Sequence, residues 1–408
     1  MAILRGGGIP VRPRTACLSA AVARGAAVAP SEAATTYKIT RFCPSNDPGA
    51  AYDLWDRADI NNRGEVVGYF EALYAREGRL DNRTYLYSSG TWTDLSALHP
   101  GMVQFGELSV INDAGQVITT PAGMGSDHWS ALYSHGVMTQ LGTLGGNWVR
   151  ANDINQSGQI VGSSKTADGR LHAFIYQDGV MTDIGTAGWA ASEAWAINDA
   201  GSVVGTLEPS SSDSFRPHVF RYSGGVMTDL GDCWPGDPPA NAVMDVLKIN
   251  KAGQILCRTR SWSSTMGVPN NSYILDGDAE ISLDFPAWDI NDAGQVIGDS
   301  GKFYDGGQTK SLGIYARDIN NVGQVVGSHT PAPGETRLVL YASGRTWDVD
   351  ELVDAGDPAK GIVHLEDAYR INDSGTIVAK GYDDSDDPTV GSLCRAYLLT
   401  LTGVAAGR

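Results

Sequence analysis

The chain has 408 residues, of which 42% are hydrophobic and 19% are charged, and 50 are glycine. This composition suits many short strands joined by turns and argues against a helical bundle or a disordered chain. The formal net charge of −17 argues against a nucleic-acid backbone as partner, because such binding requires a basic surface. No apolar run is long enough to predict a membrane span.

Residues 1–36 differ in composition from the rest of the chain. Three arginines precede a stretch of small residues at 16–29, which is the order found in a secretory signal. Arg24, however, interrupts the part that should be apolar. We expect a disordered leader or weak signal peptide, then a single domain at 37–402, and a disordered tail at 403–408.

A short motif, Ile-Asn-x-x-Gly followed by an apolar run, then recurs eight times. Its isoleucines are 29 to 52 residues apart, and they are Ile60, Ile111, Ile154, Ile197, Ile249, Ile290, Ile319 and Ile371. The average spacing is close to that of a four-stranded propeller blade. We therefore predict an all-β fold, a β-propeller of about eight four-stranded blades, with seven blades as the alternative.

Each motif is predicted to form a hairpin between the two inner strands of a blade. Asparagine suits the first position of a type I turn and glycine the fourth, so we interpret the asparagines as turn formers rather than ligands. A second hairpin follows, as at 172–185. His172 and His218 stand where other repeats have arginine or tryptophan, which indicates a role in strand packing.

The last repeat has strands at 370–379 and 394–401 but no fourth strand. The unassigned strand at 37–42 can supply it, because ring closure removes exposed strand edges. Cys43 and Cys394 would then meet at one edge of the blade, where a disulfide would require an oxidising compartment. Cys233 and Cys257 form a second candidate pair, and isolated buried thiols are the alternative for both.

Several motifs recur in a fixed order and carry a family resemblance. They are His-Ala-Phe at 172–174, Gly-Val-Met-Thr-Asp-Ile-Gly at 179–185, Leu-Gly-Thr-Leu-Gly-Gly at 141–146, and the repeated hairpins. Over roughly residues 37–402 the chain resembles the HAF-repeat family of extracellular repeat proteins. The resemblance implies a bacterial, propeller-like protein that is secreted or periplasmic, and it implies no single activity.

The long connections all leave the ring opposite the tight turns, which predicts a working face there. The innermost strands begin on that face. Four positions before the repeated isoleucines stand Asp56, Glu107, Arg150, Glu193, Asp245, Pro286, Tyr315 and Asp367, and two positions before them stand Ala58, Ser109, Asn152, Trp195, Leu247, Trp288, Arg317 and Tyr369. We expect an acidic channel mouth in which like charges raise some carboxyl pKa values.

Two groups of candidate site residues follow from this pattern. The candidate ligand-binding residues are Asp56, Glu107, Arg150, Trp195, Trp288, Arg317 and Asp367. The candidate acid and base residues are Glu193, Asp245, His364, Tyr315 and Tyr369. His364 is included because a histidine beside carboxylates titrates near neutral pH.

The leading interpretation is a monomeric, secreted protein that binds a small molecule, a glycan or a cationic ligand at this mouth. The alternatives are a cofactor-independent lyase, cyclase or hydrolase, and a structural surface protein. The sequence contains no His-Glu-x-x-His, nucleophile-elbow or phosphate-loop motif. No organic cofactor is expected, and a divalent cation such as calcium at the acidic mouth is an open alternative.

Overall fold

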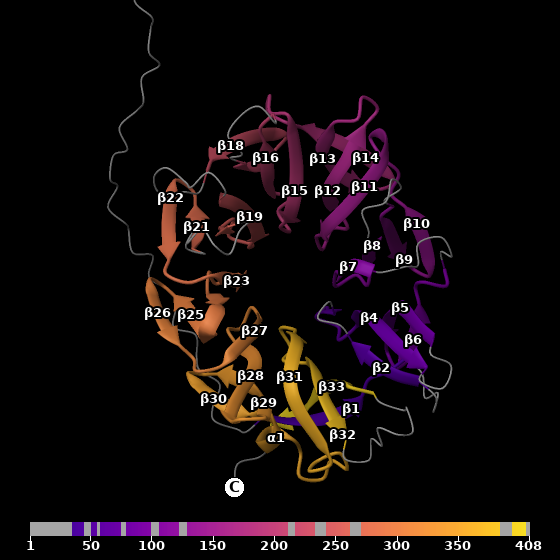
Figure 1. Cartoon of the computed structure of the whole chain (residues 1–408), viewed down its shortest axis with the longest axis vertical. Helices are drawn as coiled ribbons and strands as arrows, with labels where there is room; N and C mark the ends of the chain where they lie inside the picture. The colour runs from indigo at the N-terminus through magenta and orange to yellow at the C-terminus, as the bar shows by residue number, and fades with distance from the viewer. Residues whose placement is uncertain are drawn as a thin grey trace, which may run out of the picture.

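Eight antiparallel sheets form a ring in the computed structural model, as Figure 1 shows. The structure describes residues 35–44, 50–54, 58–74, 79–98, 106–121, 129–210, 217–232, 242–261, 271–383 and 394–404. Within these ranges the only helical segments are η1 (Asp299–Gly301) and α1 (Val349–Leu352). The prediction of an eight-bladed, all-β propeller is confirmed, and the seven-bladed alternative is wrong. Residues 1–34 of the predicted leader lie outside the described residues, whereas Thr35 and Thr36 belong to a strand.

Each blade runs outward from the central axis in chain order. Blade 1 contains β2 (Ala50–Leu54) and β3 (Asp59–Ile60), both paired with β4 (Val66–Tyr74), and then β5 (Arg79–Ser88) and β6 (Thr91–Asp94). Blade 2 contains β7 (Gly106–Ile111), β8 (Val117–Pro121), β9 (Ala131–Ser134) and β10 (Val137–Gln140). Blade 3 contains β11 (Gly145–Ile154), β12 (Ile160–Thr166), β13 (Leu171–Gln177) and β14 (Val180–Gly185). Blade 4 contains β15 (Ala191–Ile197), β16 (Val203–Glu208), β17 (His218–Ser223) and β18 (Val226–Gly231).

The other half of the ring follows the same order until the last blade. Blade 5 contains β19 (Ala242–Ile249), β20 (Ile255–Ser261), β21 (Ser272–Asp276) and β22 (Ala279–Leu283). Blade 6 contains β23 (Ala287–Ile290), β24 (Val296–Gly298), β25 (Lys302–Asp305) and β26 (Gln308–Ser311). Blade 7 contains β27 (Tyr315–Ile319), β28 (Val325–Ala332), β29 (Glu335–Ala342) and β30 (Arg345–Asp348). Blade 8 contains β31 (Val363–Ile371), β32 (Ile377–Asp383), β33 (Ala396–Val404) and, from the other end of the chain, β1 (Thr35–Arg41).

The repeated asparagine shapes its own turn and also joins its blade to the next. Asn155 Oδ1 accepts a hydrogen bond from the N–H of Gln159 at 2.9 Å, and its Nδ2 donates to the carbonyl oxygen of Asn198 in blade 4 at 3.1 Å. The inter-blade contact recurs at all eight junctions, and Asn372 donates to the carbonyl of Asn61 at 2.9 Å. The prediction of turn formers is confirmed, but the closed ring of hydrogen bonds was not foreseen.

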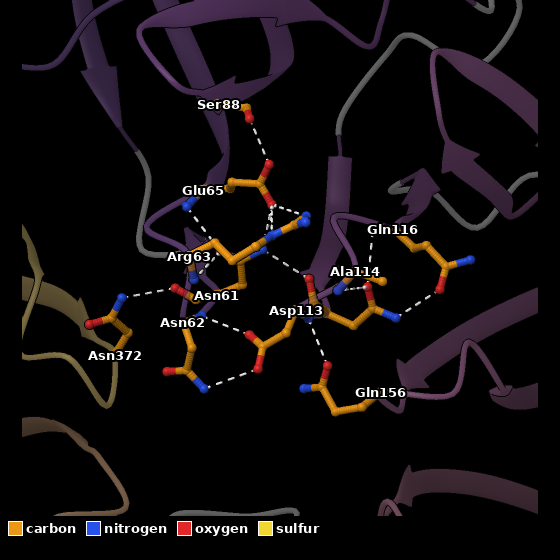
Figure 2. Close-up of polar contacts among 11 residues, drawn as sticks. Asn61, Asn62, Arg63, Glu65, Ser88, Asp113, Ala114, Gln116, Gln156 and Asn372 are labelled. Carbon is orange, nitrogen blue, oxygen red and sulfur yellow. Dashed lines mark hydrogen bonds and ion pairs between the residues drawn. The ribbon is translucent and has the colours of Figure 1, made fainter.

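The residue after each asparagine forms a second chain of contacts around the ring. Figure 2 shows the N–H of Asn62 donating to Asp113, and the N–H of Asp113 donating to Gln156, both at 2.7 Å. The pattern occurs at seven junctions. It is interrupted between Asp199 and Lys251, because a lysine side chain offers no acceptor.

We predict that removing one asparagine of the ring weakens the whole domain. Asn155→Ala removes the acceptor used by the N–H groups of Ser157 and Gln159 and the donor to the carbonyl of Asn198. We expect the free energy of unfolding to fall by about 2 to 4 kcal/mol in chemical denaturation. Ser157→Ala is the matched control, because Ser157 is exposed in the same turn and only its backbone bonds Asn155. Equal effects of the two substitutions would contradict the prediction.

The two ends of the chain meet in blade 8. Strand β1 pairs antiparallel with β33, with Tyr37 opposite Leu401 and Arg41 opposite Tyr397. Cys43 and Cys394 form a disulfide beside this pairing, with Cα atoms 6.0 Å apart. Both the closure and this disulfide are therefore confirmed. The other candidate pair stays untested, because Cys233 lies outside the described residues; Cys257 is buried in the core between blades 4 and 5.

We predict that reduction of this disulfide loosens the ring closure. The bond links residues 351 positions apart, so its loss frees a long loop in the unfolded chain and is expected to cost about 2 to 5 kcal/mol. Thermal midpoints are compared with and without reductant. The Cys43→Ser, Cys394→Ser double variant serves as control, and its midpoint should be low and independent of reductant. A wild-type midpoint that reductant leaves unchanged would rule out a stabilising role.

Candidate functional site

The innermost strands carry a β-bulge at the same place in six blades. In blade 3 the register shift lies between Ala151 and Asp153, so that Asn152 is the extra residue. Blades 4 to 8 repeat it at the equivalent position. Successive side chains of a regular strand alternate between faces, and a bulge re-aims one of them. Asn152 and Asp153 therefore both line the channel, as do Trp288 and Asp289.

One part of the channel is a cavity of about 600 Å³ enclosed by all eight blades. The residues directly before the repeated isoleucines surround it, and we call them the throat ring. They are Asp59, Val110, Asp153, Ala196, Lys248, Asp289, Asp318 and Arg370. The ring combines four carboxylates with two cations.

Three throat carboxylates also connect neighbouring blades. Asp59 accepts hydrogen bonds from the N–H of Ile60 and from the N–H of Ile111 in blade 2, both at 3.0 Å. Asp153 repeats this pattern with its own isoleucine and that of blade 4, and Asp318 accepts from the isoleucine of blade 8 at 2.7 Å. This position was not among the predicted site residues, although an aspartate directly before Ile-Asn is visible in four repeats.

The charges of the throat ring act on one another across the channel. Lys248 Nζ lies 2.7 Å from Asp289 Oδ1, and 46% of the lysine side chain remains exposed to the channel. Burial acts to lower the pKa of Lys248, but the surrounding carboxylates, Asp289 first, outweigh it and raise that pKa. Burial raises the pKa of Asp153 to about 7, and it raises the pKa of Asp318 to about 7 as well.

We predict that the throat makes the fold more stable at mildly acidic pH. The pKa of Asp153 is near 4 in an unfolded chain and about 7 in the fold, so the folded state binds the proton more tightly. Stability should therefore rise as pH falls from about 7 toward 4 and be lost as pH rises through 7. Asp153→Asn should reduce the slope of the thermal midpoint between pH 5 and 8.

The control for this prediction is Asp278→Asn, which changes an exposed turn carboxylate. It should leave the slope unchanged. The prediction fails if the wild-type midpoint rises with pH over this range, or if Asp153→Asn and wild type give parallel curves.

A second cavity of about 670 Å³ opens between blades 6, 7 and 8. It shares Trp288, Arg317 and Arg370 with the throat cavity, so the two are parts of one channel. We call it the side pocket. Its lining includes Trp288, Asp299, Ser300, Tyr315, Arg317, Ser328, Thr330, Thr336, Tyr369 and Arg370.

The carboxylates expected at the acidic mouth have arginine neighbours in the described structure. Asp245 lies 3.2 Å from Arg258, and Asp367 lies 2.7 Å from Arg317. Burial, with a contribution from Glu208, raises the pKa of Glu193 to about 7, and the charge of Arg150 opposes the shift.

Two members of the expected acidic row cannot be placed. Asp56 lies outside the described residues, and Glu107 lies in β7 with its side chain outside them. The three described carboxylates of this row, Glu193, Asp245 and Asp367, thus each have a compensating arginine, which is Arg150, Arg258 and Arg317 respectively.

The aromatic candidates reach the channel in different ways. Trp195 lines the throat cavity and donates from Nε1 to Thr206 Oγ1 at 3.1 Å. Trp288 is 47% exposed and Tyr315 is 63% exposed, and both line the side pocket. Arg150 lies over the ring of Trp195, 5.9 Å from its centroid. Two of the three rings are thus open to a ligand.

The five acid and base candidates are not gathered at one cavity. Tyr315 and Tyr369 line the side pocket, but the Tyr369 hydroxyl donates to the carbonyl of Leu54 at 2.6 Å and the residue is 5% exposed. His364 stacks on Tyr382 with ring centroids 4.8 Å apart. Neither His364 nor Glu193 nor Asp245 lines the throat cavity or the side pocket.

The repeated histidines have a structural role, as the sequence analysis expected. His172 Nδ1 lies 2.8 Å from Asp183, and His218 Nδ1 lies 2.8 Å from Asp229. Arginine makes the same contact with the aspartate eleven positions later in blades 1 and 7. The contact joins the third strand of a blade to the fourth, which explains why His-Ala-Phe is followed by Thr-Asp in the motif.

No family model and no curated protein matches the sequence. Among solved structures, the β-propeller domain of the Trilobed protease from Pyrococcus furiosus is similar at TM-score 0.46 and 10% identity, over 76% of this chain and 99% of that one. The Pyrococcus horikoshii acylaminoacyl peptidase gives TM-score 0.43 and 11% identity, over 82% and 57%. A prolyl endopeptidase gives TM-score 0.47 and 11% identity, over 86% and 55%. Each likeness concerns the propeller fold and carries no argument about function.

Among the described residues, no group of three or more histidine, cysteine, aspartate or glutamate side chains is placed to hold a metal ion. Neither helical segment among them has the length and apolar character needed to cross a bilayer.

Proposed function

We propose that this protein binds a small polar ligand in its central channel, where the side pocket joins the throat. The observation that carries the proposal is the wall shared by the two cavities. Trp288, Arg317 and Arg370 belong to both, so a ligand there contacts an aromatic ring and two guanidinium groups. Concave sites with a few converging polar groups are the usual form of a small-molecule site.

Binding fits the geometry better than catalysis does. The catalytic interpretation needs an acid and a base within reach of one bound molecule. Glu193 has a pKa suited to that role, but it does not line the throat cavity or the side pocket. The hydroxyl of Tyr369 is already donated to a backbone carbonyl.

We further propose an extracytoplasmic location and membership of the HAF-repeat family. The disulfide between Cys43 and Cys394 supports the location, because structural disulfides persist in oxidising compartments. The family proposal is supported by the fixed order of the motifs and by their consistent structural roles, such as the pairing of His172 with Asp183.

The proposal is tested by a thermal-shift screen of the full chain against sugars, amino acids, polyamines, nucleotides and divalent cations, calcium included. A ligand at one hundred times its Kd should stabilise the fold by about 2.7 kcal/mol. Arg317→Met should abolish most of this gain. Arg170→Met is the matched control, because Arg170 also pairs with an aspartate but lies in an exposed turn of blade 3.

The two variants separate a channel ligand from a surface ligand. A ligand whose effect survives Arg317→Met, or is lost equally in Arg170→Met, binds elsewhere and contradicts the proposal. A screen in which no compound shifts the midpoint also counts against it.

A further inference from the structure

The side pocket owes its opening to the short blade 6. Strands β23, β24 and β25 have four, three and four residues, and η1 joins β24 directly to β25. In blade 7, β28 and β29 have eight residues each. Because blade 6 ends sooner than blade 7, it leaves the start of β27 uncovered. The result is that Tyr315, the first residue of β27, is 63% exposed.

Two aromatic rings from adjacent blades stand in this opening. Trp288 occupies the bulge of β23, and the guanidinium of Arg258 lies over its ring, 5.1 Å from the centroid. Arg258 is in turn fixed by Asp245 at 3.2 Å, so the indole is oriented while 47% of the residue stays exposed. A single exposed aromatic residue is ordinary, but two that line one cavity provide a large, rigid contact surface.

The rest of the pocket wall supplies both donors and acceptors. Ser300, Thr330 and Thr336 present hydroxyl groups and are exposed. A hydroxyl can donate and accept, while Arg317, held by Asp367, adds a forked donor and Asp299 adds a carboxylate acceptor. This wall suits a ligand that carries many hydroxyl groups.

The charge of the wall selects against the other ligand classes. Arg317 and Arg370 line the pocket, and Arg258 already lies over Trp288, so an added cation would be repelled. An anion would meet Asp299 in the pocket and the throat carboxylates beyond it. A purely apolar ligand would displace water from the pocket hydroxyls without replacing its hydrogen bonds.

We infer that the side pocket binds a neutral oligosaccharide, with sugar rings packed against Trp288 and Tyr315. A pyranose has an apolar face of C–H groups, which suits the electron-rich face of an aromatic ring, and an edge of hydroxyl groups. The hydroxyl edge would meet Arg317, Asp299 and the threonines. The inference rests on the proposed binding function and names the ligand class for the same channel.

The test uses the full chain and a glycan array, followed by calorimetry with cellotetraose, maltotetraose, mannotetraose and N-acetylated chitotetraose. Tetragalacturonate and a chitosan tetramer are the charged comparators. We expect a neutral glycan to bind, and Trp288→Ala and Tyr315→Ala each to weaken binding about tenfold or more. Trp129→Ala is the matched control, because Trp129 is 41% exposed but lines neither cavity.

Trp288→Tyr is the second variant, since it keeps an aromatic ring and should retain most of the affinity even if the alanine variant folds poorly. The inference is overturned if a neutral glycan binds Trp288→Ala and Tyr315→Ala as tightly as it binds the wild-type protein. It is likewise overturned if the charged comparators bind the wild-type protein more tightly than the neutral glycans do. It is also overturned if the array shows no neutral ligand. In that case, a different ligand that depends on Arg317 would leave the proposed binding function intact, whereas the absence of any ligand would remove both.

Discussion

The structure depends on the hydrogen bond that each repeated asparagine donates to the backbone of the next blade. A four-stranded sheet cannot bury both of its faces alone, so every blade requires its neighbours. The asparagine contact fixes the distance and rotation between blades at the end of each innermost strand, and it recurs around the complete circle. Because the donor and the acceptor both belong to asparagine turns, the repeat unit contains everything needed to join two copies of itself.

The bulge of the innermost strands explains how such a repetitive scaffold forms a varied channel. In blades 3 to 7 two successive residues at the bulge line the throat, and those residues differ between blades. The turns are held constant by their hydrogen bonds, while the bulge residues range from Asn152 to Trp288. The turn asparagine and the bulge residue therefore occupy different positions of the same short motif, whereas three throat aspartates both line the channel and join blades.

The sequence was sufficient to predict the propeller fold and the pairing of the two chain ends, because these follow from periodicity and from the pairing of edges. It favoured eight blades over seven, and it left the Cys43–Cys394 disulfide open against buried thiols. It was less informative about the channel. The bulge is not visible in the sequence, and simple strand alternation selects the residues four and two positions before each repeated isoleucine. Trp288 and Arg317 lie at the second of these positions and line the channel. Asp153 also lines the channel, but it lies one position before its isoleucine and was not predicted.

The expectation of an acidic mouth shows a different limit. Asp245 and Asp367 were chosen for their charge, yet their partners come from other strands, Arg258 from β20 and Arg317 from β27. A charge count along one strand cannot register such compensation, which depends on how strands are placed in space. The side pocket was equally hidden, because it arises from the difference in length between two blades.

The second chain of contacts is interrupted at Lys251, so the joint between blades 4 and 5 lacks a hydrogen bond that the other seven junctions have. Between blades 4 and 5, Ala196 cannot supply the carboxylate that Asp153 supplies one junction earlier. Beside the asparagine contact, the turn of blade 5 receives a hydrogen bond from Arg221 of β17, whose guanidinium donates to the carbonyl of Gly253. A long side chain holds position less firmly than a short one. This joint lies diametrically opposite the junction of blades 8 and 1, and the disulfide closes blade 8 on that side of the ring. Small changes in the diameter of the channel would then come from movement at the junction of blades 4 and 5, while the disulfide keeps the ring closed.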